Sequence, residues 1–406
     1  MKKIIFFKNV FLVVILFLLI VNFPVKAQAI DEFAQDEVIV KLKNEIHQDV
    51  LEKIPFLNES KISQKLLLSQ TFVLKVPRGQ VKKLESLLNK NPLIEYAEPN
   101  FIAKTQDLIP NDTSFNLQWG LNNPSDADID APEAWAINQG NETIKIAVLD
   151  TGINLSHEDL VNKIDSLRKD FTGSGIEDDY GHGTHVAGIA AAETNNATGV
   201  AGMGFNSKII VGKVLDNSGS GYYSWISDGI KWAVDNGASV INLSLGGYAS
   251  SRTLEQAIKY AWSKGVVITA AAGNDNRGSK LYPAGYTNVI AVAATDNNDK
   301  KASFSNFGKW VSVAAPGVNI YSTFPNHPFY LQTEYGRSMN YDYGNGTSMA
   351  TPFVSGAAAL IWASGKCAPL NNSCVRNRIQ STADKISGTG KYWRYGRINA
   401  YKAISP

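Results

Sequence analysis

The sequence predicts an α/β fold: a mostly parallel, doubly wound sheet with helices on both faces, preceded by a small ferredoxin-like α+β domain. Two observations predict this arrangement. From about residue 131 onward, short apolar runs alternate with helical segments, which is typical of a parallel sheet covered by helices. Before that point, residues 37–103 follow the order β-α-β-β-α-β. Residues 105–110 are expected to form an exposed joint between the two parts.

The small domain is predicted from changes in hydrophobic period. Residues 37–43 alternate apolar and charged side chains, as a half-buried strand does. Val81, Leu84 and Leu88 repeat at helical spacing. The predicted strands are 37–43, a weaker one at 66–68, 72–76 and 93–102, and the predicted helices are 47–53 and 81–88.

The large domain contains apolar runs that indicate strands buried on both faces. Helical repeats ending at Gly237 and Gly265 separate some of these runs. In such sheets, functional groups collect at the carboxyl ends of the strands. The predicted strands are 144–149, 240–243, 266–270, 289–293 and 311–314.

Composition excludes several classes of protein. The 406 residues are 44% hydrophobic, and 39 basic against 37 acidic side chains give a formal net charge of +2. This balance excludes a highly charged disordered chain. It also argues against a nucleic-acid partner, because there is no basic excess to neutralise phosphates. Two cysteines cannot build a multi-disulfide scaffold or a four-cysteine zinc site.

The first 29 residues are predicted to be a signal peptide. Basic residues precede the apolar run 10–21, Pro24 breaks the run, and 27–29 has the small-x-small form of a cleavage site. The run is shorter than the roughly 20 residues that span a bilayer. The alternative is an uncleaved N-terminal anchor. Export would leave a secreted, extracellular protein with no stable membrane association after cleavage.

An oxidising compartment favours a disulfide between Cys367 and Cys374, closing a short loop. The alternative is two free, buried thiols. Residues 371–373 between them (Asn-Asn-Ser) are typical of an exposed turn, which favours the disulfide.

Three motifs carry candidate chemistry. Asp150 ends a buried strand in the motif DTG, and His182 lies between glycines in GHGTH. Ser348 follows a glycine turn in GNGTSMATP and begins a helix whose first turn should contain Pro352. A metal pair of His182 and His185 is the alternative for the second motif, but no usual third ligand is nearby.

Together these residues fit a nucleophilic triad. A serine hydroxyl needs a base, an imidazole can take and return its proton, and an aspartate can hold the imidazole tautomer. A developing oxyanion also needs hydrogen-bond donors. Asn274, at the end of another buried strand, and the backbone N–H of Ser348 could supply them.

The order Asp150, His182, Ser348 within DTG, HGTH and GTSMATP resembles the subtilisin-like serine proteases, or subtilases. The chain from residue 110 to its end is similar to the thermitase branch, and 94–100 (IEYAEPN) resembles a subtilase propeptide. The resemblance implies a propeptide over 30–107 and a catalytic domain over 108–406. It implies the triad and oxyanion roles given above.

The resemblance also implies how substrate binds. Two segments should hold an extended protein or peptide substrate as an added strand, with broad specificity and an apolar or aromatic residue before the cut. The alternative is that the two glycine-containing segments are only turns, with no role in substrate binding. The residues are Gly219, Ser220, Gly221, Ser244, Leu245 and Gly246.

Calcium is implied by the resemblance. The side chains of Asp112, Asp159 and Asn196, with the backbone carbonyls of Glu193, Thr198 and Val200, would form an oxygen shell suited to Ca²⁺. The alternative is an asparagine-rich loop held by hydrogen bonds alone.

The resemblance further implies a zymogen, in which the propeptide acts as intramolecular inhibitor and the enzyme cuts itself near Asp107 to become a mature, monomeric protease. Two other functions remain open: a dedicated processing protease for one precursor, and an inactive binding protein on the same fold. The tyrosine-rich segment 330–345, longer than in close relatives, is either a substrate-facing loop or a surface turn.

Overall fold

The computed structural model describes residues 33–43, 46–54, 57, 59–102, 107–369 and 371–405. The predicted signal peptide, residues 1–29, lies outside the described residues. The described chain forms two compact units, divided between Lys104 and Thr105. In the part of the chain that is described, no helix combines the length and the apolar character needed to cross a bilayer.

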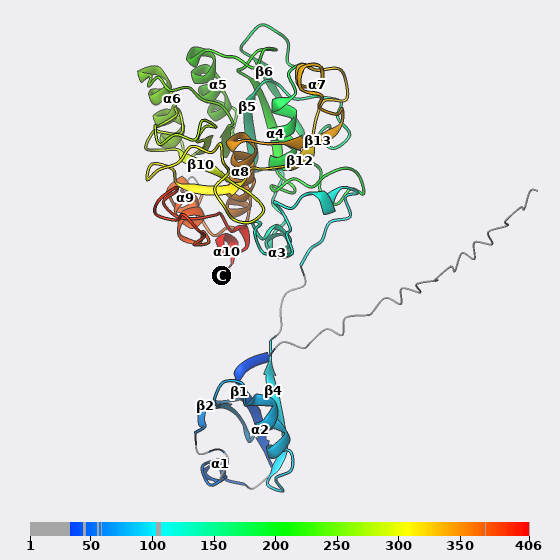
Figure 1. Cartoon of the computed structure of the whole chain (residues 1–406), viewed down its shortest axis with the longest axis vertical. Helices are drawn as coiled ribbons and strands as arrows, with labels where there is room; N and C mark the ends of the chain where they lie inside the picture. The colour runs from blue at the N-terminus through cyan, green and yellow to red at the C-terminus, as the bar shows by residue number, and fades with distance from the viewer. Residues whose placement is uncertain are drawn as a thin grey trace, which may run out of the picture. The chain divides into compact units, whose positions relative to one another are not determined.

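The small unit has the predicted ferredoxin-like order. An antiparallel sheet runs β2-β3-β1-β4, and α2 packs its buried residues Val81, Leu84 and Leu88 against it (Figure 1). The elements are β1 (Phe33–Leu42), α1 (Asp49–Glu52), β2 (Lys61–Lys65), β3 (Thr71–Lys75), α2 (Val81–Leu88) and β4 (Ile94–Phe101).

One predicted strand of this unit is wrong. Residues 66–68 do not form a strand, and Leu67 and Leu68 are exposed in the turn that precedes β3. The strand lies earlier, at β2, which is at the edge of the sheet and buries almost none of its side chains. An edge strand of this kind has no hydrophobic pattern, so its sequence gives no strand signal.

The large unit is built on a seven-stranded sheet in which every pairing is parallel, in the order β11-β10-β9-β8-β5-β7-β6. The five predicted strands occur within one or two residues of their expected positions, but β6 and β7 were not predicted. The strands are β5 (Lys145–Asp150), β6 (Ile164–Asp170), β7 (Lys208–Lys213), β8 (Val240–Leu243), β9 (Val267–Ala271), β10 (Ile290–Thr295) and β11 (Val313–Pro316).

Helices cover both faces of this sheet, as the doubly wound fold requires (Figure 1). Alternate residues of β5 enter different cores: Ile146 packs with helices α4 and α8, and Leu149 packs with α5 and α6. The helices are α3 (Ala131–Ile137), α4 (His182–Ala191), α5 (Tyr223–Asp235), α6 (Arg252–Ser263), α7 (Tyr330–Tyr335), α8 (Thr347–Ala363), α9 (Asn372–Ser381) and α10 (Ala400–Ile404).

Two smaller features complete the unit. Strands β12 (Ile320–Thr323) and β13 (Tyr341–Gly344) pair antiparallel, and α7 lies in the connection between them; α7 and β13 both belong to the tyrosine-rich segment. The disulfide between Cys367 and Cys374 is present, as predicted, with its Cα atoms 5.7 Å apart.

Candidate active site

Polar side chains gather at the carboxyl ends of the parallel strands. Asp150 is the last residue of β5, Ser244 follows β8, and Asn274 lies shortly after β9. Because these strands are parallel, their carboxyl ends lie at one edge of the sheet. The amino-terminal ends of α4 and α8 bring His182 and Ser348 to the same edge.

Asp150 and His182 are paired at this edge. The Nδ1 atom of His182 lies 2.7 Å from Oδ1 of Asp150, whose side chain is fully buried, while 20% of the His182 side chain is exposed. Glycine makes this approach possible, because a Cβ atom on Gly183 would lie 2.0 Å from the carbonyl oxygen of Gly152. The carboxylate therefore holds the ring while its other nitrogen remains available.

Two opposing effects set the pKa of His182. Burial disfavours the imidazolium, whereas the negative charge of Asp150 and its hydrogen bond favour it. The net effect raises the pKa of His182 above its ordinary value of 6.5.

Ser348 is the second residue of α8 and lines a pocket of about 250 Å³ together with His182 and Asn274. Its hydroxyl donates to the carbonyl oxygen of Ser244 at 3.1 Å, rather than to His182. In return, the hydroxyl of Ser244 donates to the carbonyl oxygen of Ser348 at 2.8 Å. The two serines are thus tied together, and the Ser348 hydroxyl must rotate before it can reach the imidazole.

Pro352 explains why the Ser348 carbonyl is free to accept this bond. Pro352 lies in the second turn of α8, so the prediction that it falls in the first turn is wrong. A proline has no N–H, so it cannot donate to the carbonyl four residues before it, which belongs to Ser348. The hydroxyl of Ser244 satisfies that oxygen instead.

Asn274 presents its amide donor to the same pocket. Its Oδ1 accepts hydrogen bonds from the backbone N–H and the hydroxyl of Thr347, both at 2.9 Å. Because the oxygen is fixed in this way, the NH₂ group of Asn274 is directed away from Thr347 and remains available. The backbone N–H of Ser348 lies in the first turn of α8, where helix N–H groups have no partner within the helix.

A buried network behind His182 was missed by the sequence analysis. Both carboxylate oxygens of Asp178 are saturated, accepting from Thr151, Gly181 and Thr184 at 2.7–2.8 Å. Burial raises the pKa of Asp178 and lowers that of Lys213, whose ammonium donates to the backbone carbonyls of Thr151 and Glu177. The acidic residues just before GHGTH were the signal that could have found this support.

The six predicted substrate residues lie together. Two segments, 219–221 and 244–246, line a pocket of about 440 Å³ with His182. Apart from His182, its lining has no acidic or basic side chain; it includes Tyr180, Leu215, Tyr223 and Ile226.

His185 lines the same pocket as His182 but does not pair with it. Its Nε2 atom lies 3.2 Å from the carbonyl oxygen of Asp342, and its ring packs against Phe324. Burial lowers the pKa of His185 to about 3, so the ring is neutral. The two histidines have separate partners, which disfavours the metal-pair alternative.

Comparison with known proteins decides the family. The profile of the Subtilase family matches residues 141–397, more than half of the chain. The chain belongs to the subtilase family. The profile of the fervidolysin N-terminal prodomain matches residues 21–100.

Relatives of this subtilase are proteases. It is 45% identical to a thermophilic serine proteinase of Bacillus sp. (strain AK1) over 92% of this chain and 88% of the relative. It is 48% identical to thermitase of Thermoactinomyces vulgaris over 73% of this chain and 99% of thermitase. A solved protease of Pseudoalteromonas arctica covers 73% of this chain and 98% of its own, with a TM-score of 0.65 and 33% identity. This protein is a subtilisin-like serine protease with an N-terminal prodomain.

The predicted calcium residues of this subtilase also lie together. Oδ1 of Asp112 is buried and has no hydrogen-bond partner among the described residues, while Asp159 accepts from Asn196, Val200 and Tyr341. Burial raises the pKa of Asp112, and that of Asp159 to about 6, with the charge of Asp112 adding to the latter shift. Two neighbouring buried carboxylates, one with a bare oxygen, fit a cation.

The remaining ligands would be neutral oxygens. Within the described chain, no group of three or more His, Cys, Asp or Glu side chains could hold a metal ion. The backbone carbonyls of Glu193, Thr198 and Val200 accept no hydrogen bond from the described residues. Such oxygens suit the hard cation Ca²⁺ rather than a transition metal.

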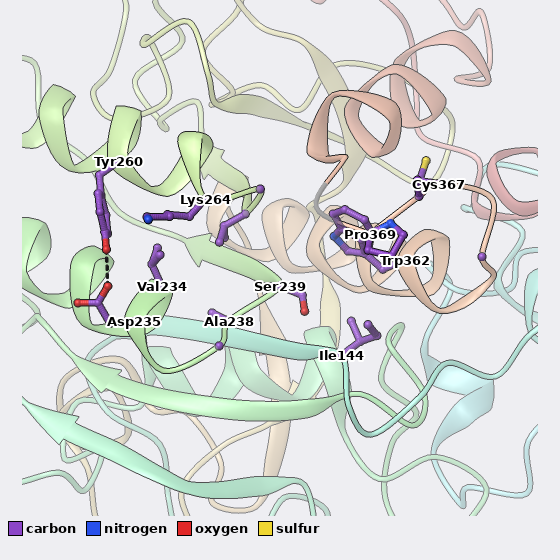
Figure 2. A pocket seen from close by; sticks show the side chains of 15 residues that line it. Ile144, Val234, Asp235, Ala238, Ser239, Tyr260, Lys264, Trp362, Cys367 and Pro369 are labelled. Atoms are coloured by element: carbon purple, nitrogen blue, oxygen red, sulfur yellow. Dashed lines mark hydrogen bonds between the residues drawn. The ribbon is translucent and has the colours of Figure 1, made fainter.

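A larger hollow lies at the opposite edge of the sheet. It has a volume of about 710 Å³ and is lined by residues that precede strands, such as Ile144, Ser239 and Val266. Figure 2 shows Trp362 and Pro369 at one end of it and the Tyr260–Asp235 hydrogen bond at the other. None of the triad candidates lines it, so size alone does not locate the active site of this subtilase.

Proposed function

We propose that this subtilase is a secreted serine endopeptidase, made as a self-processing zymogen, with Asp150, His182 and Ser348 as its catalytic triad. The observation that carries the proposal is the 2.7 Å pairing of His182 with buried Asp150, beside a pocket that also contains Ser348 and Asn274. An imidazole held by a carboxylate next to a serine is the arrangement that acyl transfer requires.

In the proposed reaction, Nε2 of His182 takes the hydroxyl proton of Ser348 as Oγ attacks the peptide carbonyl carbon. Asp150 stabilises the imidazolium that forms. The amide of Asn274 and the backbone N–H of Ser348 donate to the oxyanion. His182 then gives its proton to the leaving amine, and water hydrolyses the acyl-enzyme by the same route.

Substrate specificity before the cut follows from the pocket beside segments 219–221 and 244–246. We propose that an extended peptide adds to these segments as a strand, since main-chain bonding tolerates many sequences. The lining offers Leu215, Tyr223 and Leu245 but no fixed charge. A long cation would lose hydration there without gaining a partner.

Peptides with both ends blocked test the endopeptidase function. We expect internal cleavage, with kcat/KM at least about tenfold higher for Phe than for Lys before the cut, corresponding to about 1.4 kcal/mol. The measurement is the initial rate on two quenched peptides that differ only at that residue. A strong Lys preference would refute the apolar specificity, and no internal cleavage would favour an inactive binding protein.

The pH dependence of kcat/KM follows from the raised pKa of His182. Only the neutral imidazole can accept the serine proton, so activity is lost as pH falls through the folded-state pKa. Because that pKa is raised, the acid limb should have its midpoint above 6.5, the ordinary value. Rates between about pH 5 and 9 give the midpoint; a value below the ordinary one would contradict the proposed control by Asp150.

We also propose a structural Ca²⁺ site. Asp112, Asp159 and Asn196 would hold the ion with the carbonyls of Glu193, Thr198 and Val200, as the bare oxygen of Asp112 supports. Its charge would offset the repulsion between the two buried carboxylates and bind the loop 193–200 to the rest of the unit. The ion takes no part in the chemical step.

Chelation is expected to lower thermal stability. An ion at a hundred times its Kd stabilises the folded state by about 2.7 kcal/mol, which corresponds to roughly 4 °C in Tm for a unit of this size. The measurement is Tm by calorimetry with excess calcium and with excess chelator. The Asp112→Asn variant should lose the response, and Asp228→Asn, an exposed change on α5, should keep it. An unchanged wild-type Tm counts against the site.

The two-unit organisation supports the zymogen. We propose that residues 1–29 are a signal peptide, 30–107 an inhibitory propeptide and 108–406 the catalytic domain, with the maturation cut near Asp107. The prodomain match over residues 21–100 and the separate compact core of the small unit support this division. The propeptide would assist folding of the catalytic domain, because a parallel sheet depends on non-local contacts and folds slowly.

A further inference from the structure

The pocket that contains Ser348 continues into the tyrosine-rich segment. Besides His182, Asn274 and Ser348, its walls include Leu331, Tyr335 and Arg337. Figure 1 shows α7 and β13, both orange, on the same side of the unit as α4, which begins at His182. Of the two possibilities for residues 330–345, the pocket lining favours a substrate-facing segment over a surface turn.

The segment is fixed to the residues just before His182. The backbone N–H groups of Tyr330 and Leu331 donate to the carbonyls of Asp179 and Tyr180, at 2.8 and 3.1 Å. The rings of Tyr180 and Tyr330 stack with their centroids 5.3 Å apart and their planes 11° apart. Phe329 packs in the same way on Phe324, at 5.3 Å. These contacts make α7 a fixed wall of the pocket.

Arg337 is the only side chain in this pocket lining that is charged at every working pH. The other ionisable groups of the lining are Tyr180, His182, His185 and Tyr335, and His185 is neutral because burial lowers its pKa to about 3. In the part of the chain that is described, the guanidinium of Arg337 has no ion pair and no side-chain hydrogen bond. Of the acids nearest in sequence, Glu334 is exposed, and Asp342 accepts from the backbone N–H groups of Ser338 and Tyr343.

The two pockets define the direction of a bound peptide. The acyl half of a substrate that pairs with segments 219–221 and 244–246 fills the 440 Å³ pocket. His182 lines both this pocket and the 250 Å³ pocket that contains Ser348. An extended chain that passes Ser348 must then continue into the smaller pocket. The residues after the scissile bond therefore meet Tyr335 and Arg337.

We propose that residues 330–337 form a specificity wall on the leaving-group side, where Arg337 selects substrates that carry a carboxylate after the scissile bond. The carboxylate is either an acidic side chain or the C-terminus of a short leaving peptide, since both present the same planar, bidentate acceptor to a guanidinium. This inference rests on the proposed endopeptidase function. It gives the protease two unlike preferences, apolar before the cut and acidic after it.

The test uses the mature enzyme and three quenched peptides with one shared acyl half. Their leaving halves carry Glu with an amidated end, Gln with an amidated end, and Gln with a free C-terminal carboxylate. The readout is the ratio of kcat/KM values between peptides, because a merely structural change would alter all three rates together. The rates are measured at low salt, where charge interactions are least screened. We expect the wild type to prefer a carboxylate peptide over the neutral one by on the order of fivefold.

Variants assign the preference to Arg337. In Arg337→Gln the ratio should fall to about one, and in Arg337→Lys part of the preference should return. In Arg337→Glu the ratio should invert, so that the neutral peptide is cleaved faster than either carboxylate peptide. Arg394→Gln is the charge control. It removes one arginine charge, as Arg337→Gln does, but from an exposed residue at the amino-end edge of the sheet, where the Arg394 backbone N–H bonds the carbonyl of Val311. It should keep the wild-type ratio.

The outcomes separate this inference from the function on which it rests. The role of Arg337 is overturned if the wild type cleaves the neutral peptide with a ratio near one, or if Arg337→Gln keeps the wild-type ratio. Neither result contradicts the proposed endopeptidase function. No cleavage of any peptide overturns both. A preference confined to the Glu peptide, or to the free C-terminus, identifies which carboxylate the pocket takes.

Discussion

Replacing Ser348 with alanine is expected to lower kcat on peptides by about a millionfold, the general cost of losing the nucleophile in subtilisins. The reason is that alanine removes the hydroxyl that would form the acyl-enzyme and leaves His182 with no serine proton to accept. The same change should stop maturation, so the purified variant should retain residues 30–107. Intact mass and peptide kinetics measure the two effects.

Ser364→Ala is the control for this variant. Ser364 caps the other end of α8, where its hydroxyl donates to the carbonyl of Ile361 at 2.8 Å. Ser364→Ala removes one serine hydroxyl, as Ser348→Ala does, but at the far end of α8. It should leave both processing and activity close to wild type. Clean loss of residues 30–107 from the purified Ser348→Ala protein would disprove self-processing, even if peptide hydrolysis were abolished.

Replacing Asn274 with alanine should lower kcat by about 10²–10³ with little change in KM; the scale is the cost of losing such a donor in a subtilisin. The amide should matter only as negative charge develops on the carbonyl oxygen, so the ground-state complex loses little. Alanine also leaves the N–H and hydroxyl of Thr347 without the hydrogen-bond acceptor that Oδ1 of Asn274 provides. Asn274→Asp keeps that acceptor oxygen, but it replaces the donor with a second oxygen and adds a negative charge beside the developing oxyanion, so it should be at least as slow.

Asn297→Ala, in the exposed turn after β10, controls for the loss of an asparagine side chain and should retain full activity. Steady-state kinetics on one blocked peptide give kcat and KM separately. A rise in KM at unchanged kcat would show that Asn274 binds substrate rather than the transition state, and the oxyanion role would have to be abandoned.

The strands of the large sheet that were predicted are those with mainly apolar, uncharged runs, such as β8 and β9, in which every side chain is buried. The missed strands carry charge. β6 is an edge strand with no fully buried side chain, and β7 begins and ends with lysine although Lys213 is buried. A lysine whose ammonium bonds two backbone carbonyls looks like a surface residue in the sequence, because its partners are not side chains.

The residues of the active site also fall into those that the sequence could place and those that it could not. Asp150 and Asn274 could be placed because each ends an apolar run, and parallel strands bring their ends together. Asp178 and Arg337 could not, because their positions depend on loops whose paths no periodicity encodes. Leu331 and Tyr335 gave a similar ambiguity: a tyrosine-rich loop has the same composition on a surface as in a substrate cleft.

Activation of Ser348 by His182 is the step on which the proposed protease function depends. Fluorophosphonate labelling followed by peptide mass mapping tests it most directly, in the wild type, in His182→Ala and after heat denaturation. We expect one adduct, on Ser348, that forms in the native wild type and is lost in the other two samples. An adduct on a different serine, or labelling of Ser348 at the wild-type rate without His182, would contradict it.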